Sequence, residues 1–211
     1  MQYDLAGPPG NSSRHGVTAE RAEIDGRVCT RVTLTAEATA GVAGIDYIDM
    51  PTFLRIPANF VNGSISVDIR SRLRSDAPDY ARAFAGIAYR ISADCQRFEA
   101  VYVRPLNGLK LNPPAPRDQR ALQYFVYPDW KFDRLRDAYP DGRYEAGADI
   151  GPDEWLHLKL DIVGRQVIAL INGTEVLSIE EAKNEAASGD IGLWVDIGTE
   201  AYFSDLHIIE E

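Results

Sequence analysis

Residues 84–104, FAGIAYRISADCQRFEAVYVR, contain two alternating segments on either side of a short polar turn. Alternation with a period of two is typical of β-strands, because successive side chains point to opposite faces of a sheet. In each segment one parity is mainly aliphatic. The residues that alternate with the aliphatic ones end at Arg90 in the first segment. In the second segment they include Tyr102 and end at Arg104. One face of each strand is therefore expected to form core, and the other to present aromatic and guanidinium groups that suit a binding surface.

Similar patterns recur along the chain between strong turn signals. The dipeptides Asp25-Gly26, Asn62-Gly63 and Asn172-Gly173 are typical of β-hairpin turns. Further strands are predicted at residues 17–24, 28–35, 52–56, 64–71, 120–127, 155–163, 166–171, 175–179, 190–196 and 201–209. Strands at this spacing predict an all-β protein, either a sandwich or a barrel. Because no repeat, linker or change of composition interrupts the pattern, residues 1–211 are expected to form one domain.

Four segments do not fit a strand pattern. Residues 1–16 are rich in Gly, Pro and Ser and are expected to be extended or poorly ordered. The proline-rich residues 107–117 predict a long loop without regular structure. Residues 127–147 are expected to hold at most one helical turn, and residues 180–187 to add another. A connection as long as residues 127–147 is usually functional or disordered.

The charge of the chain narrows the choice of partners. The formal net charge is −10, and the isoelectric point is near 4.8. Such acidity argues against nucleic acid or an anionic membrane as the main partner. No apolar stretch is long enough to span a bilayer, and the N-terminus lacks a basic region followed by an apolar run. We therefore expect a cytoplasmic protein, or a secreted one if a leader precedes this sequence. Cys29 and Cys95 are expected to be buried free thiols.

Several motifs resemble those of one superfamily. They are Tyr102-Val103-Arg104-Pro105 followed by Asn107, then Gln123-Tyr124, then Gly192-Leu193-Trp194. Together with the strand succession from residue 59 to the C-terminus, they resemble the concanavalin A-like lectin/glucanase jelly rolls. Within that superfamily, the chain is similar to bacterial domains related to 3-keto-disaccharide hydrolases and to laminin-G-like modules. The resemblance implies a single jelly-roll β-sandwich of two antiparallel sheets, with sugars bound on a concave face.

The strand residues that alternate with the predicted core residues, and so lie on the opposite face, provide the candidate site. Asp68, Arg70, Arg90, Tyr102, Arg104, Gln123, Tyr127, Trp194 and Asp196 are the strand residues assigned to that face, and Asn107, Trp130 and Arg134 come from adjoining loops. Aromatic rings stack on the C–H faces of sugars, and planar guanidinium or amide groups bind paired hydroxyls. The alternative is that the arginines pair with acidic residues of neighbouring strands and that the aromatic side chains pack locally.

The sequence leaves catalysis open. Glycoside hydrolysis normally needs two carboxyl groups, and glucanases of this fold place them in an E-x-D-x-x-E string, which is absent. Asp68 and Asp196 are the candidate acid and base. A keto-sugar enzyme needs only one base, and none of the three histidines stands out for that role. No cofactor motif is present; the resemblance allows a structural calcium ion, although no D-x-D-x-D-G string supports one.

Three functions are consistent with these observations. The first is a lectin-like protein that binds a saccharide or related polyol, with the arginines favouring an anionic one. The second is a glycoside or keto-sugar hydrolase or lyase that acts on the same face. The third is a non-catalytic interaction domain of the laminin-G type.

Overall fold

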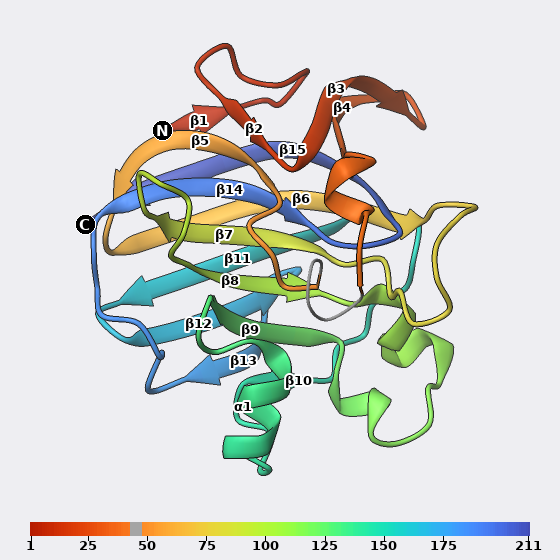
Figure 1. Cartoon of the computed structure of the whole chain (residues 1–211), viewed down its shortest axis with the longest axis vertical. Helices are drawn as coiled ribbons and strands as arrows, with labels where there is room; N and C mark the ends of the chain where they lie inside the picture. The colour runs from red at the N-terminus through yellow and green to blue at the C-terminus, as the bar shows by residue number, and fades with distance from the viewer. Residues whose placement is uncertain (43–47) are drawn as a thin grey trace.

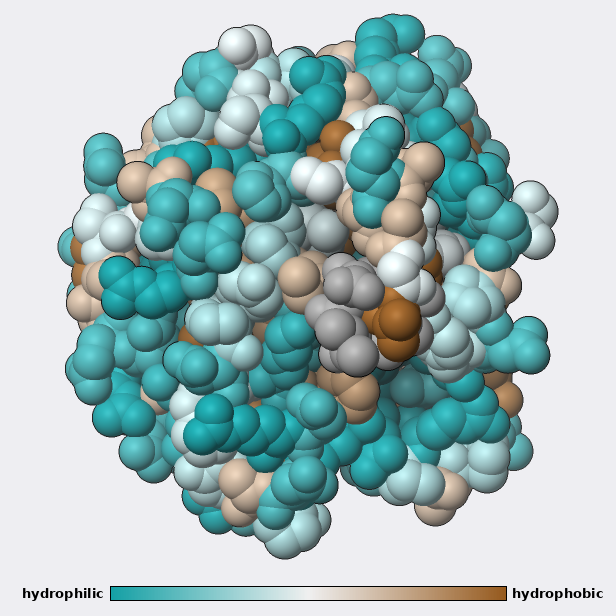
Figure 2. All heavy atoms as spheres, in the orientation of Figure 1, coloured by the Kyte–Doolittle hydropathy of each residue, from teal (hydrophilic) through white to brown (hydrophobic). Residues whose placement is uncertain are grey.

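Two antiparallel β-sheets pack face to face in the computed structural model, which describes residues 1–42 and 48–211 (Figure 1). This arrangement confirms the predicted all-β sandwich. The aliphatic faces of the strands pack against each other between the sheets. Examples of their fully buried side chains are Ile87, Val101, Leu160 and Leu193. Most of the surface seen in Figure 2 is hydrophilic, as expected of a chain in which 26 % of the residues are charged.

One sheet has eight strands. Along the sheet they are β13 (Thr174–Ile179), β12 (Gln166–Ile171), β11 (Leu156–Val163), β6 (Gly63–Leu73), β15 (Thr199–Glu210), β4 (Arg27–Leu34) and β3 (Val17–Ile24), and β1 (Gln2–Tyr3) pairs with β15. Strands distant in sequence lie side by side, because β6 pairs with both β11 and β15. Such crossovers between strands that are not neighbours in sequence are the mark of a jelly roll.

The other sheet has seven strands. They follow the order β10 (Glu145–Ala146), β9 (Leu122–Tyr127), β8 (Phe98–Val103), β7 (Ala85–Ile91), β14 (Gly189–Val195), β5 (Phe53–Phe60) and β2 (Ser13–His15). The short elements are α1 (Phe132–Ala138) and the 3-10 turns η1 (Glu37–Thr39), η2 (Pro105–Asn107), η3 (Leu109–Leu111) and η4 (Arg117–Gln119). Helix α1 lies next to β9 and β10, at the lower edge of the sheet in Figure 1.

Most predicted strands are present within a few residues of their expected bounds. Three expectations were wrong. Residues 180–187 form bends instead of a helical turn. Residues 107–117 are not wholly irregular, because parts of η2, η3 and η4 fall within them. Residues 127–147 hold more than one helical turn, because the seven residues of α1 make about two turns. Residues 1–16 are extended in part, which is one of the two states expected of them, and they contribute β1 and β2, which pair with β15 and β5.

Arg90 does not lie on the face that strand alternation predicts. Between β7 and β14 the register shifts, so that Tyr89 and Arg90 together oppose Ile191, and Arg90 has a φ of 52°. Such a β-bulge re-aims the side chain that it carries. As a result the Arg90 guanidinium lies beside the buried Glu99 carboxylate, with Nη1 2.8 Å from Oε1.

The Arg90–Glu99 pair lies between neighbouring strands of the seven-stranded sheet, at one end of the sandwich. Both side chains have no exposed area. Arg90 also donates to the carbonyl oxygens of Val61, after β5, and Gly164, after β11. The remaining Glu99 oxygen accepts a hydrogen bond from the Tyr124 hydroxyl. The role of Arg90 in this structure is therefore to satisfy buried groups between the sheets.

Glu99→Gln is expected to lower the free energy of unfolding by about 3–5 kcal/mol, because it leaves a buried guanidinium without its counter-charge. Urea denaturation followed by tryptophan fluorescence measures the change. Asp141→Asn is the control, since Asp141 pairs with Arg143 on the surface and both side chains are about half exposed. An equally small effect of both substitutions would contradict this role of the buried pair.

Candidate functional site

A cavity of about 340 Å³ opens at the end of the seven-stranded sheet where β8 and β14 finish and β7 begins. Its walls come from the ends of these strands, from the loop between β6 and β7, from the turns after β8, and from α1. The lining residues are Ile48, Asp49, Tyr80, Arg82, Phe84, Tyr102, Arg104, Asn107, Arg117, Arg120, Phe132, Arg136 and Asp196. Five of them are arginines, which is a high density of positive charge for a protein whose net charge is −10.

One buried carboxylate holds three of the five arginines. Glu145 of β10 has a side chain only 7 % exposed, and it contacts Arg136 at 2.7 Å, Arg120 at 3.1 Å and Arg104 at 3.4 Å. Arg104 also donates to the Tyr102 hydroxyl at 2.6 Å. Because one negative charge serves three guanidinium groups, the cluster stays positive while its side chains are fixed in position.

The other two arginines have no carboxylate partner among residues 1–42 and 48–211. Arg82 donates to the backbone carbonyls of Asp79 and Ala81. Arg117, which is exposed at the cavity mouth, makes no side-chain hydrogen bond or ion pair in the described part of the chain. Burial, followed by the charges of Arg117 and Arg104, lowers the pKa of Arg82. The charge of Asp79 opposes this lowering, and the effect of the two neighbouring guanidinium groups is secondary to burial.

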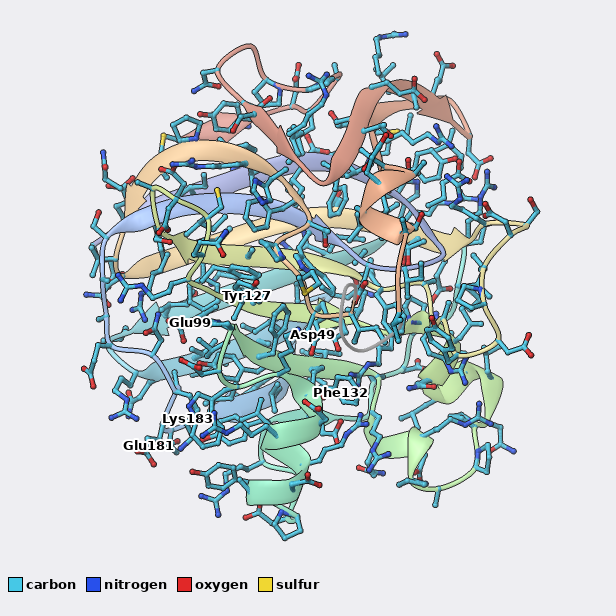
Figure 3. All side chains as sticks on the ribbon, in the orientation of Figure 1. Asp49, Glu99, Tyr127, Phe132, Glu181 and Lys183 are labelled. Carbon is cyan, nitrogen blue, oxygen red and sulfur yellow. The ribbon has the colours of Figure 1, made fainter. Side chains whose placement is uncertain are left out.

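Two aspartates form the acidic part of the wall. The Asp49 backbone N–H donates to Asp196 Oδ2 at 2.9 Å, and the Ile197 backbone N–H donates to Asp196 Oδ1 at 2.7 Å. Asp49 Oδ2 accepts a hydrogen bond from the backbone N–H of Phe132, which places it at the start of α1 (Figure 3). The loop before β5, the end of β14 and α1 are thus joined by these two carboxyl groups.

Both carboxyl groups have raised pKa values. Burial, and secondarily the charge of Asp49, raises the pKa of Asp196 to about 7. Burial also raises the pKa of Asp49, although the Phe132 N–H and the nearby Arg104 oppose the rise. Asp196 therefore exchanges its proton near neutral pH, as groups at functional sites often do.

Two buried acceptor atoms in the wall have no hydrogen-bond partner among residues 1–42 and 48–211. They are Asp49 Oδ1 and Asn107 Oδ1, and the Asn107 amide nitrogen is already engaged with the Arg120 carbonyl. Buried polar atoms are nearly always paired in proteins, so an unpaired one calls for a donor from water or a ligand. Both atoms belong to residues that line the arginine-rich cavity.

Four residues predicted from sequence meet at this cavity: Tyr102, Arg104, Asn107 and Asp196. Two more support it from behind. Gln123 is fully buried and contacts Arg104 at 3.3 Å. Trp194 is also fully buried, and its ring lies 4.7 Å from that of Tyr102. Neither residue is open to a ligand.

The remaining predicted residues lie elsewhere. Tyr127 stacks on Phe98, and Trp130 packs near Tyr139 with the Arg134 guanidinium 4.2 Å above its ring. Arg90 is occupied by Glu99, as described above. These side chains make contacts within the protein and do not line the cavity.

The placement of Asp68 and Arg70 with the other candidates was wrong. Both residues belong to β6 of the eight-stranded sheet, not to the sheet that carries the cavity. Asp68 pairs with Arg27 and with His157, and Arg70 pairs with Asp25 and Asp153. Alternation assigns a residue to one face of its own strand, but it does not identify the sheet to which the strand belongs.

Sequence reasoning missed Asp49, Arg82, Arg117, Arg120 and Arg136. These residues lie in loops and in α1, where alternation gives no signal. The arginines within and just after the proline-rich loop could have indicated part of this site, because charged residues in long loops are often functional.

Within the described ranges, no group of three or more His, Cys, Asp or Glu side chains is arranged to hold a metal ion. None of the helices in those ranges is long and apolar enough to cross a membrane. Cys29 and Cys95 are both buried and free, as predicted.

Comparisons with known proteins identify the fold. No family model and no curated protein matches the sequence. Among solved structures, the carbohydrate-binding module CBM66 from Bacillus subtilis is similar, with a TM-score of 0.55 and 12 % identity over 92 % of this chain and 95 % of the module. A Bacillus subtilis protein of unknown function with a galectin-like fold gives a TM-score of 0.57 and 11 % identity, covering 98 % of this chain and 93 % of that one.

A putative glycosyl hydrolase from Parabacteroides distasonis is also similar, with a TM-score of 0.53 and 10 % identity over 99 % of this chain and 100 % of that one. These neighbours are jelly-roll sandwiches, and the chain has the same fold. It is a fold that carbohydrate-binding proteins and glycosidase-related proteins share. At such low identity the similarity concerns the fold alone, so the function has to be argued from the cavity.

The pKa of Asp196 predicts a particular dependence of stability on pH. The folded value of about 7 lies above the ordinary value of 3.8, so the native state holds the proton more tightly than the unfolded chain does. This contribution to stability is complete below pH 3.8 and is lost as the pH rises to about 7. The free energy of unfolding of the wild type, minus that of Asp196→Asn, is expected to fall across this interval. Urea titrations at several pH values measure it, and parallel profiles for the two proteins would contradict the assignment.

Proposed function

We propose that this protein binds acidic saccharides, such as uronic acids, in the arginine-lined cavity. The observation that carries the proposal is the excess of positive charge. Five arginines line the cavity, whereas among the described residues Asp49 and Asp196 are its only lining carboxyl groups, and Glu145 pairs with three of the arginines from outside the lining. An excess of two positive charges remains even when all three are ionised. A sugar carboxylate would supply the missing negative charge.

The cavity also suits the rest of a sugar. Asp49 Oδ1 and Asn107 Oδ1 have no donor in the part of the chain that the structure describes, and hydroxyl groups are the donors that a saccharide has in abundance. Phe84, Tyr102 and Phe132 add aromatic surface, against which the C–H face of a pyranose ring packs. A volume of about 340 Å³ falls within the range of small-molecule sites. An inorganic anion would pair with the arginines, but it would neither pack against the aromatic surface nor match the volume of the cavity.

Catalysis on the same ligand is the second candidate, and the pKa of Asp196 favours it. A carboxyl group with a pKa of about 7 suits general acid or base chemistry in a glycoside or keto-sugar hydrolase or lyase. However, Asp196 is only 2 % exposed, and both of its oxygens accept backbone N–H groups. A two-carboxyl mechanism would also need Asp49 in place of the distant Asp68. Binding is therefore the better-supported function, and release of new reducing ends from uronate oligosaccharides would favour catalysis.

Isothermal titration calorimetry with glucuronate and galacturonate tests the proposal. Both are expected to bind, whereas glucose and galactose bind far more weakly. Arg82→Gln and Arg117→Gln are each expected to weaken uronate binding by roughly tenfold to a hundredfold, because each removes a charge-assisted hydrogen bond worth about 1.5–3 kcal/mol. The affinity should also fall with added salt.

Arg97→Gln is the matched control for these variants. Arg97 is exposed in the turn between β7 and β8, at the end of these strands opposite the cavity, and its replacement changes the net charge by the same amount. It is expected to leave uronate affinity unchanged. Equal binding of uronates and neutral sugars, or equal losses in all three variants, would refute the proposal.

A further inference from the structure

A second cavity adjoins the arginine-lined one. It has a volume of about 410 Å³ and is lined by residues from η1 and its neighbours, from the loop between β6 and β7, and from the turn after β14. Thr35, Thr39, Arg74, Asp76 and Tyr80 supply its polar and aromatic groups.

The two cavities share a wall. Tyr80 lines both, and it lies in the loop whose earlier residues face the second cavity and whose Arg82 and Phe84 face the first. The turn after β14 has the same arrangement, because Asp196 lines the first cavity and the residues that follow it line the second. A ligand longer than one sugar unit could therefore leave the arginines and continue past Tyr80.

The second cavity differs from the first in charge. Arg74 is the only arginine among the described residues that line it, and it is paired with Asp76 through two hydrogen bonds of 2.9 and 3.1 Å, so the two charges offset each other. Thr35 Oγ1 accepts the Ala38 backbone N–H, and because its own proton has no acceptor among residues 1–42 and 48–211, that proton is available to a ligand. Thr39 Oγ1 donates to the Ala36 carbonyl and keeps its lone pairs available. A neutral wall that offers both a donor and an acceptor suits an uncharged sugar.

We infer that the ligand is an oligosaccharide of mixed charge, with an acidic unit in the arginine-lined cavity and an adjacent uncharged unit in the second cavity. This inference rests on the proposed function and specifies its substrate class. Tyr80 lies at the boundary, where its ring is placed to contact both units.

The test compares uronate monosaccharides with a panel of disaccharides in which glucuronate or galacturonate is joined to a neutral hexose or pentose. At least one disaccharide is expected to bind about tenfold more tightly than its uronate alone, the gain from one or two added hydrogen bonds. Thr39→Trp fills the second cavity and should abolish this gain without changing the affinity for the monosaccharide. Thr174→Trp, on the exposed edge strand β13, is the control and should leave the gain intact.

The outcomes separate the inference from the function on which it rests. If uronates bind but no disaccharide binds more tightly, or if the gain survives in Thr39→Trp, the second cavity is not a subsite. Retained uronate affinity in Thr39→Trp shows that the variant is folded, and Thr39→Ala provides a milder second test. If no uronate binds at all, the proposed function itself fails and the inference falls with it.

Discussion

The site depends on the contact between Glu145 and three arginines. Guanidinium groups repel one another, so Arg104, Arg120 and Arg136 can line one cavity only because a largely buried carboxylate lies among them. That carboxylate fixes the arginines without neutralising them. The positive charge that remains is available to a ligand, so a strongly acidic protein has a local site that would attract an anion.

The sandwich provides the rigid support that such a cluster needs. Tyr102, Phe125 and Trp194 pack with ring centroids 4.7–5.7 Å apart beneath the cavity, and none is more than 1 % exposed. The opposite end of the sheet is closed by the buried Arg90–Glu99 pair. Arginines therefore serve two purposes in this fold: at one end they satisfy interior groups, and at the other they surround a cavity.

Alternation in the sequence predicted nearly every long strand, because a half-buried strand must place apolar residues on every second position. It placed Tyr102, Arg104 and Asp196 together, since they lie at or just beyond the ends of strands in one sheet. It failed for Arg90, where a bulge breaks the alternation, and for Asp68, whose strand belongs to the other sheet. Alternation could not predict Asp49 and Arg82. They are loop residues, and long-range contacts that produce no periodic pattern in the sequence fix their positions.

A crystal structure of the protein with bound glucuronate tests the central claim most directly. The account predicts that the sugar occupies the arginine-lined cavity, with its carboxylate against Arg82 or Arg117 and its hydroxyls near Asp49 and Asn107. A sugar bound elsewhere, for example on the outer face of the eight-stranded sheet, would contradict the account. So would an empty cavity at a glucuronate concentration that saturates binding in solution.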